Sequence, residues 1–359
     1  MISDRIHQAR LAARLTLHEL GQRVGVSHTA IQKYEKGRIT PSSTQLLKLA
    51  QACGVRTEYF FRTHRVALNN PEFRKDVTFG KKAQEALKLR VIELVEPRIE
   101  LLGAFPSSPL PVFTRPTALP LCIKHLDELE HFADAVRTSW DLGKDPIADL
   151  TDTLESRGCL MILIDEPHPG FSGFTATAVT DHGDQFPVIA LSKQWPGDRQ
   201  RFTLAHELGH ILLAGRLTDD LNEEAACNRF AGAFLAPKNA VLKRLGSKRH
   251  AIEWPELHAL KHEFGLSMGG WLYRAKECEV ISKATYLKLA RRFSANGWLT
   301  QEPGEPLATE SPRLFEQLVY RALGERFISD SKAAELLRIP MMRFHQQRQL
   351  ESFDAVGRQ

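Results

Sequence analysis

Apolar residues recur at helical spacing through the first sixty positions of the chain. In LTLHELGQRVGVSHTAIQKYEKGRITPSSTQLLKLAQACGV, three such groups are separated at Gly25 and Gly37. Thr16 and Ser27 are suited to cap the first two helices, and glycine permits the tight turn between them. A helix, a tight turn and a second helix predict a helix-turn-helix, whose second helix runs from Ser27 to about Lys36.

The second helix of such a unit enters the major groove of DNA, so we expect its polar side chains to contact the duplex. Gln32 can pair with an adenine edge, and Lys33 can pair with guanine or phosphate. Arg10 and Lys36 are further candidates for phosphate contacts. The expected DNA-binding residues are His28, Thr29, Gln32, Lys33 and Arg38. The alternative is a small helical dimerisation domain with a solvated basic face.

The net positive charge of the chain comes entirely from this segment. Residues 1–65 hold 11 Lys and Arg against 4 Asp and Glu, whereas the remainder holds 37 against 39. The net charge is therefore +7 in the first part and −2 in the rest. A basic module on a nearly neutral body indicates contact with phosphates, and we expect double-stranded DNA as a partner.

Residues 2–61 resemble the phage-repressor-type (Xre-like) helix-turn-helix family, on the stretch GVSHTAIQKYEKGRITPSSTQLLKLAQACGV. The resemblance implies an all-α DNA-binding domain, expected over residues 1–65. Proteins of this family often carry a glutamine that contacts the DNA backbone one residue after the Thr16 position. Here that residue is Leu17, which puts this one contact in doubt but not the fold.

The next segment, residues 66–120, is expected to be a helical and proline-rich linker. KKAQEALKLRVIELVEPRIELLGAF has apolar residues at helical spacing and is expected to be interrupted or kinked at Pro97. PSSPLPVFTRPTALP then carries five prolines, which favour an extended, semi-rigid spacer. We therefore place a domain boundary near residue 120.

A mixture of helices and strands follows over residues 121–280. Two amphipathic helices are expected over 123–143 and 145–158, the second capped by Asp145. CLMILIDE, FSGFTATAV and FPVIAL are rich in strand-forming residues and predict three strands. Helices combined with a small sheet predict an α+β domain.

Directly after these strands comes RQRFTLAHELGHILL, an apolar helical run with two histidines four residues apart. Residues four apart share one helix face, so His206 and His210 can reach one tetrahedral ion, with Glu207 beside a bound water. A buried helix that happens to contain two histidines is the alternative. A third ligand is therefore needed to favour a metal site.

NEEAACNRFAGAFLAP supplies a second helix with Glu223 and Glu224 near its start. Glu224 and Asn228 lie four apart and share a face. Glu224 can bind zinc while Asn228 accepts a hydrogen bond from the other nitrogen of a ligand histidine. Two histidines and one carboxylate leave the fourth position of a tetrahedral zinc ion open for water, which is the catalytic arrangement.

The HELGH helix and the helix that follows it, together with the strand-like segments before them, resemble the ImmA/IrrE family of metallopeptidases over roughly residues 122–280. The resemblance implies an α+β, zincin-like metallopeptidase domain that uses Zn²⁺. Aligning its pattern E-x-E-A-N-x-F-A on Asn228 favours Glu224 over Glu223 as the third ligand. The second glutamate of that pattern falls on Ala226, which is a departure.

The two resemblances leave two functions open. One is a DNA-binding transcriptional regulator whose zinc-dependent peptidase domain cleaves a partner repressor or regulatory protein. In it, His206, His210 and Glu224 bind the metal, Asn228 supports a ligand and Glu207 is the catalytic base. The other is an antitoxin or autorepressor of a toxin–antitoxin pair, whose metallopeptidase-like domain binds a protein partner without cleaving it.

Residues 281–359 are expected to form a helical C-terminal region, which completes a multidomain chain. ISDSKAAELLRIP has weak helix-turn-helix character, although we expect a packing or partner-binding segment here.

Five dispersed cysteines argue against a disulfide framework, and no apolar run is long enough to span a membrane. The start lacks a secretory signal, so we expect a cytoplasmic protein. A homodimer would suit palindromic DNA sites.

Overall fold

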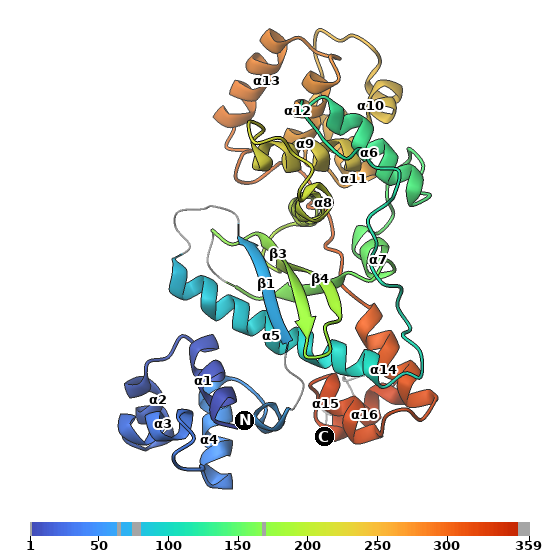
Figure 1. Cartoon of the computed structure of the whole chain (residues 1–359). Coiled ribbons are helices and arrows are strands. Elements are labelled where there is room, and N and C mark those ends of the chain that lie inside the picture. The colour runs from blue at the N-terminus through green and yellow to red at the C-terminus, as the bar shows by residue number, and fades with distance from the viewer. Residues whose placement is uncertain (1, 63–65, 74–79, 167–169, 351–359) are drawn as a thin grey trace, which may run out of the picture.

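The computed structural model describes residues 2–62, 66–73, 80–166 and 170–350. Residues 63–65 and 351–359, at the outer ends of two expected domains, lie outside the described residues. The architecture is multidomain, with a helical N-terminal module, a sheet covered by helices and further helices at both ends (Figure 1). The expected fold class is confirmed.

The N-terminal module contains the predicted helix-turn-helix. Its helices are α1 (Ile2–Ala12), α2 (Leu17–Val24), α3 (His28–Glu35) and α4 (Ser43–Cys53), followed by the 3₁₀ turn η1 (Thr57–Phe61). The Thr16 side chain caps α2 in a capping box with Glu19, and Ser27 caps α3, as expected. Gly25 ends α2 with φ of 79°, a left-handed conformation that glycine adopts without strain. The buried apolar faces of these helices form a core of their own.

A four-stranded mixed sheet forms the centre of the molecule. Its strands are β1 (Val66–Phe73), β2 (Leu160–Ile164), β3 (Gly173–Thr180) and β4 (Gln185–Ser192), in the order β1-β3-β4-β2. β3 is antiparallel to β1 and β4, whereas β2 is parallel to β4. Helix α5 (Lys81–Gly103) lies on one face of the sheet, and α8 (Gly197–Leu213) lies on the other (Figure 1). Strand β2 is apolar without alternation because both of its faces are buried.

The expected linker over 66–120 is in part a piece of this central body. Residues 66–73 form the edge strand β1, and α5 contributes Leu87, Val91 and Val95 to the core beneath the sheet. The sequence hides this strand because VALNNPEF contains two asparagines and a proline, which occur in sheets mainly at edges and bulges. The register of β1 against β3 shifts between Asn69 and Glu72, next to that proline.

Seven helices of the described chain share one apolar core with α8. They are α6 (Glu128–Ser139), α7 (Leu150–Glu155), α9 (Glu223–Leu235), α10 (Lys238–Leu245), α11 (Trp254–Phe264), α12 (Met268–Glu277) and α13 (Lys283–Ala295). Helix α7 is capped by Asp149, which accepts from the Asp152 amide at 2.8 Å, and not by Asp145. The backbone carbonyl of Asp145 instead accepts from Arg137 at 2.5 Å. The helix therefore begins later in the chain than expected.

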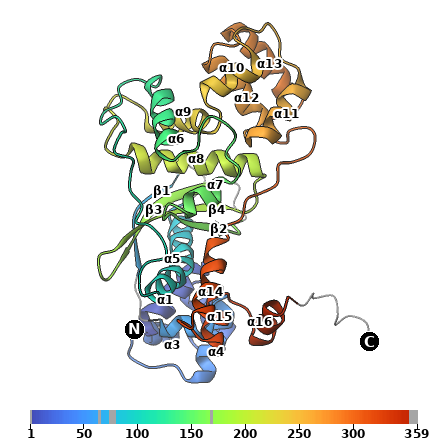
Figure 2. The same cartoon turned by 90° about the vertical axis from the view of Figure 1, so that its right-hand side faces the viewer.

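The expected C-terminal region is divided between the two ends of the molecule. Helix α13 packs with α12 at the upper end, whereas α14 (Leu314–Gly324), α15 (Asp330–Leu336) and α16 (Met341–Arg348) pack against α5 at the lower end (Figure 2). Residues 296–313 connect them along the body. Ion pairs hold this connection: Lys261 with Glu302 at 2.9 Å, and Arg201 with Glu310.

Buried charges join the N-terminal module to the central body. Arg5 of α1 donates to Glu96 of α5 at 2.6 Å, and both side chains are almost fully buried. Arg14 pairs with the buried carboxylate of Glu166 at 2.7 Å. Because removing one partner of a buried pair leaves an uncompensated charge, these contacts fix how the module sits on the body.

Helix α5 runs on through Pro97 and is not interrupted there. Proline has no N–H, so the carbonyl of Glu93, four residues earlier, lacks its helical partner. Arg62 and Arg338 donate to that carbonyl at 3.2 and 3.0 Å. The proline thus creates one acceptor that both the N-terminal and the C-terminal segments use.

Candidate metal centre and nucleic-acid interface

The HELGH motif lies on α8 in the middle of the molecule. His206 and His210 are one turn apart and nearly inaccessible, with exposed fractions of 0% and 6%. Gly209 lies between them at the crossing with α9, where an added Cβ would come within 3.2 Å of the Cα of Cys227. The glycine therefore allows α9 to approach the histidine face of α8 closely.

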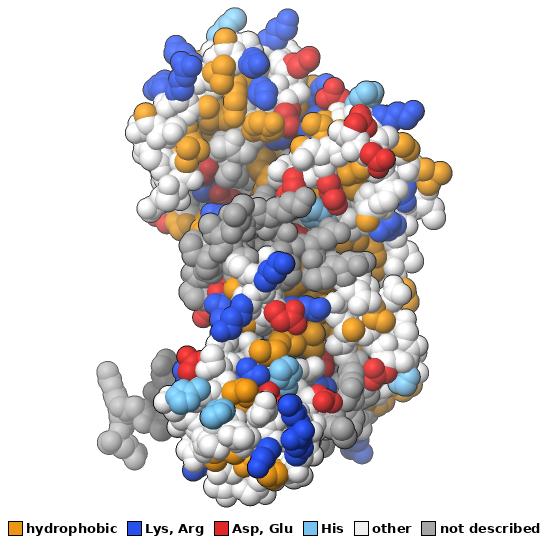
Figure 3. Space-filling view, turned by 60° about the vertical axis from the view of Figure 1, so that its left-hand side comes forward, with side chains coloured by type: hydrophobic (Ala, Val, Ile, Leu, Met, Phe, Trp, Pro, Cys, Tyr) orange, Lys and Arg blue, Asp and Glu red, His pale blue; other side chains and the backbone are white. Residues whose placement is uncertain are grey.

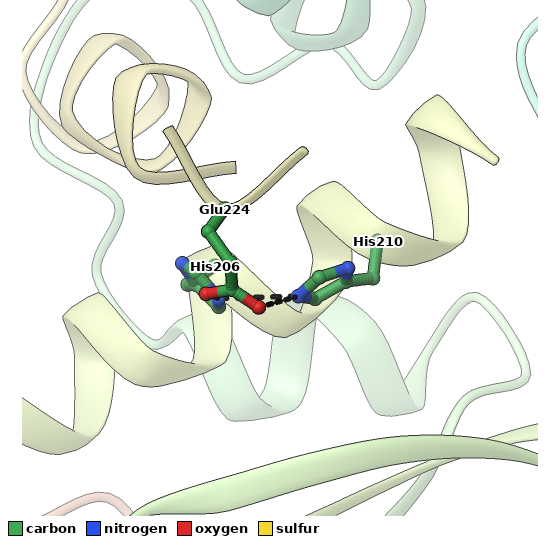
Figure 4. Close-up of side chains that lie close together, drawn as sticks. All are labelled: His206, His210 and Glu224. Atoms are coloured by element: carbon green, nitrogen blue, oxygen red, sulfur yellow. Dashed lines mark hydrogen bonds and ion pairs between the residues drawn. The ribbon is translucent and has the colours of Figure 1, made fainter. Parts of the chain in front are cut away.

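Helix α9 brings a carboxylate to the two imidazoles. Asn222 caps this helix by accepting from the Ala225 amide at 2.8 Å, which places two glutamates in its first turn. The Nε2 atoms of His206 and His210 are 3.2 Å apart. The Glu224 carboxylate lies 3.4 Å from the first Nε2 and 3.7 Å from the second. Figure 4 shows these three side chains pointing toward one another from the two helices.

The hydrogen bonds on the far side of each ring determine what these nitrogens can bind. His206 Nδ1 lies 2.9 Å from Asn228 Oδ1, and His210 Nδ1 lies 3.0 Å from Glu223 Oε1. Both partners are acceptors, so a neutral ring carries its proton on Nδ1 and turns the Nε2 lone pair toward the common point. Two lone pairs and a carboxylate that converge in this way repel one another unless a cation lies between them.

The spacing of the three groups matches a tetrahedral ion. With metal–nitrogen bonds of about 2.0–2.1 Å, two tetrahedral ligand atoms lie about 3.3–3.4 Å apart. The observed separations of 3.2 to 3.7 Å fit this requirement, and all three ligand atoms lie within 4.8 Å of one another. In the described part of the chain, no other three histidine, cysteine or carboxylate side chains come together as closely. His206, His210 and Glu224 could therefore hold a divalent metal.

The structure separates the two neighbouring glutamates, which the sequence alone leaves open. Glu224 points to the common point, whereas Glu223 accepts the Nδ1 hydrogen of His210 from the other side. Sequence reasoning names only Asn228 as such a supporting partner and misses Glu223. Its position one residue before Glu224, at the start of the same helix, is the one sequence signal that points to it.

Two further side chains near the centre, Glu207 and Cys227, are buried. Glu207 follows His206 on α8 and is 1% exposed. Cys227 is buried beside His210, and burial raises the pKa of its thiol. The side chains that converge in the described part of the chain are two imidazoles and one carboxylate, and Cys227 is not among them.

The residues expected to contact DNA are all at the surface of the N-terminal module. His28, Thr29, Gln32 and Lys33 on α3, and Arg38 after it, are exposed, and Lys36 is exposed as well. Figure 3 shows Lys, Arg and His side chains gathered over this lower part of the face. The buried side of α3 is formed by Ile31. The helix therefore presents its polar side to solvent, as groove reading requires.

One expected phosphate contact is wrong. Arg10 is 8% exposed, and its guanidinium donates to Glu35 at 2.5 and 2.9 Å and to the Leu15 carbonyl at 3.0 Å. Burial alone would raise the pKa of Glu35, but the bonds from Arg10 and His7 outweigh it and lower that pKa. Arg10 is therefore part of the packing between α1 and α3. From the sequence alone Arg10 would be taken for a surface residue, because the sequence does not show that Glu35 lies beside it.

Comparison with known proteins supports both the helix-turn-helix module and the domain that holds the histidine centre. Residues 6–60 match the helix-turn-helix family, and residues 171–276 match the peptidase family described as the IrrE N-terminal-like domain. A transcriptional regulator in the ATPase CF(0) region of Rhodospirillum rubrum, itself uncharacterised, is 42% identical over 60 residues. That match covers 17% of this chain and 56% of the relative. No solved structure matches the chain significantly.

Among the described residues, none of the helices has the length and apolar character needed to cross a bilayer.

The helix-turn-helix family is a DNA-binding fold, and the IrrE N-terminal-like family is a family of metallopeptidases, which suggests a metal at the histidine centre. The chain therefore joins a helix-turn-helix domain of the Xre type to an IrrE N-terminal-like domain in one polypeptide.

Proposed function

We propose that this protein is a DNA-binding transcriptional regulator whose second domain is a zinc-dependent peptidase that cleaves a partner repressor or regulatory protein. The observation that carries the peptidase part is the convergence of two Nε2 atoms and the Glu224 carboxylate on one point. The DNA-binding part rests on the exposed polar side of α3. The relative in Rhodospirillum rubrum is named as a transcriptional regulator, which supports the regulatory part.

Zinc bound at the centre would polarise the carbonyl of a scissile peptide bond and raise the acidity of water there. His206, His210 and Glu224 would hold it, and three protein ligands leave one position for a water molecule. Asn228 and Glu223 hold the two rings in the tautomer that presents Nε2. The protein thus orients its ligands before any substrate arrives.

Glu207 is the group that we assign to proton transfer. It follows the first ligand directly on α8 and is buried, so bulk water does not compete there. As a general base it would take a proton from the attacking water, and as a general acid it would return that proton to the leaving amine. Its role differs from that of Glu224, because it moves protons and does not bind the metal.

The test is Glu207→Gln in the full chain. The zinc content should stay at the wild-type value, because the ligands are unchanged, while cleavage should fall by about 100- to 10,000-fold. N-terminal proteomics of cells that express either form would show new protein N-termini with the wild-type chain only. Identical N-termini in both strains, with zinc bound in both, would contradict catalysis and favour the antitoxin alternative, in which the domain binds a partner without cleaving it.

A further inference from the structure

The three C-terminal helices form a small unit with a helix-turn-helix arrangement of its own. Ser329 caps α15 by accepting from the Lys332 amide at 3.2 Å. Residues 337–340 then turn the chain, and α16 begins after Pro340. The helices bury Val319 of α14, Ala333 of α15 and Phe344 of α16 in one core. Two short helices joined by a tight turn and supported by a third are the arrangement that places a helix in a DNA groove.

The surface of α16 has the composition of a helix that contacts DNA. Among its described positions Phe344 alone is buried, and it stacks on Tyr320 with ring centroids 6.4 Å apart. The helix carries no acidic residue. Its accessible polar side chains can donate to phosphates and base edges; they are Arg343, His345, Gln346, Gln347 and Arg348. Arg348 pairs with Asp330 at 2.9 Å, but this pair is exposed and such pairs are weak.

The unit lies at the same end of the molecule as the N-terminal module, opposite α10–α13 (Figures 1 and 2). One contact to the N-terminal module and others to α5 hold the unit in place. Arg56, after α4, donates to the Ala334 carbonyl of α15 at 3.3 Å. Arg338, in the turn before α16, binds both the carbonyl and the carboxylate of Glu93 at 3.0 Å. The unit that carries α16 is therefore packed against both the N-terminal module and α5.

We propose that α14–α16 are a second DNA-contacting unit, in which α16 binds duplex DNA beside the site read by α3. The inference rests on the proposed DNA binding and extends it to a second element of the chain. Charge complementarity selects DNA as the occupant, because a helix with two arginines and no carboxylate suits a phosphate backbone. The exposed Met341 and Met342 at its start would make a protein partner the competing occupant.

The experiment uses the full chain and two double variants. Arg343→Gln with Arg348→Gln removes the charges of α16, and Lys288→Gln with Arg291→Gln removes two exposed charges of α13 at the opposite end as a matched control. The probes are a fluorescein-labelled duplex from the region directly upstream of the gene and a random-sequence duplex of the same length. Fluorescence anisotropy gives the dissociation constant at several KCl concentrations.

For the α16 variant we expect the slope of log K against log salt to fall by about 1 to 2, one for each phosphate that the altered helix no longer neutralises. The affinity at low salt should fall by about 10-fold or more, and a hydroxyl-radical footprint should show no protection on one flank of the α3 site. The α13 variant should match wild type. All proteins should melt at the same temperature, because the changed positions are exposed.

Two results would overturn the inference. If the α16 variant binds both duplexes with wild-type affinity and slope while Gln32→Ala with Lys33→Ala weakens binding, α16 is not a DNA-binding element and only this inference fails. A protein that co-purifies with wild type but not with Met342→Asp would then identify α16 as a docking surface. A wild-type chain that binds neither duplex would overturn the proposed DNA binding as well.

Discussion

The proposed metal centre and the proposed DNA-binding face place their polar residues in opposite environments. The imidazoles of His206 and His210 are buried between two packed helices, whereas Gln32 and Lys33 lie on the solvent side of α3. In the first region each ligand depends on the others and on hydrogen bonds behind it. In the second, each side chain acts alone and supports no packing. Substitutions should therefore disable the metal centre as a unit, but remove only single contacts from the DNA face.

The largest effect is expected from removing a ligand. His206→Ala should reduce bound zinc from one per chain to near zero, because the two remaining groups cannot complete the site. The loss should exceed the roughly 10- to 100-fold that a supporting partner costs. Mass spectrometry of the metal in purified protein measures it, and His250→Ala, at an exposed histidine, is the control. Full zinc occupancy in His206→Ala would show that the metal binds elsewhere.

A smaller effect should follow when the support behind a ligand is removed. Asn228→Ala takes away the acceptor for His206 Nδ1, so the ring loses its fixed tautomer and orientation. Zinc affinity should fall by about 10- to 100-fold, as measured by competition with a chelator. Glu223→Ala should act similarly through His210. Unchanged affinity in both variants would mean that the helices alone orient the rings.

On the exposed face, Gln32→Ala with Lys33→Ala should weaken binding to the upstream duplex by about 10- to 100-fold, since each base contact contributes about 1–3 kcal/mol. The free energy of unfolding should change by less than about 0.5 kcal/mol, because neither side chain is packed. Zinc content should be unchanged. Wild-type affinity for DNA in this variant would show that α3 does not enter the groove.

The smallest effect concerns pH and the N-terminal module. The pKa of Glu35 is lowered in the folded state, so its contribution to stability is present above the usual value of about 4.3 and is lost as the pH falls through the lowered value. Glu35→Gln should cost about 1–2 kcal/mol at pH 7, and this difference should shrink below about pH 4. Thermal melting of both forms at neutral and acidic pH tests it. If the difference in stability between the two forms grew at acidic pH, it would contradict the lowered pKa of Glu35.

The same contrast explains how much of the molecule can be predicted from the sequence. The helix-turn-helix, the three strands β2–β4 and the helix of HELGH are local patterns, and each lies where its pattern predicts it. Edge strand β1 is not predicted because Asn and Pro are unusual within strands. From the sequence, helix α5 is expected to be part of a linker and not of the central body. The division of the C-terminal region between two ends cannot be foreseen, because it depends on packing partners distant in sequence.

At the metal centre, spacing predicts which residues can share a helix face but not which atoms meet. The distinction between Glu223 and Glu224 requires the path of α9 across α8, which Gly209 allows. Likewise, the basic composition of the first 65 residues suggests surface charge, yet Arg5 and Arg10 are buried in ion pairs. Charge counts predict the partner of a module better than they predict the role of any one arginine.

The most direct test of the metal centre is zinc K-edge X-ray absorption on the purified full chain, with zinc stoichiometry measured on the same sample. We predict one zinc per chain, bound by two imidazoles and light oxygen atoms at about 2.0–2.2 Å, with no sulfur in the shell. A folded chain that takes up no zinc, or a spectrum with a sulfur ligand near about 2.3 Å such as Cys227 would give, would contradict this prediction.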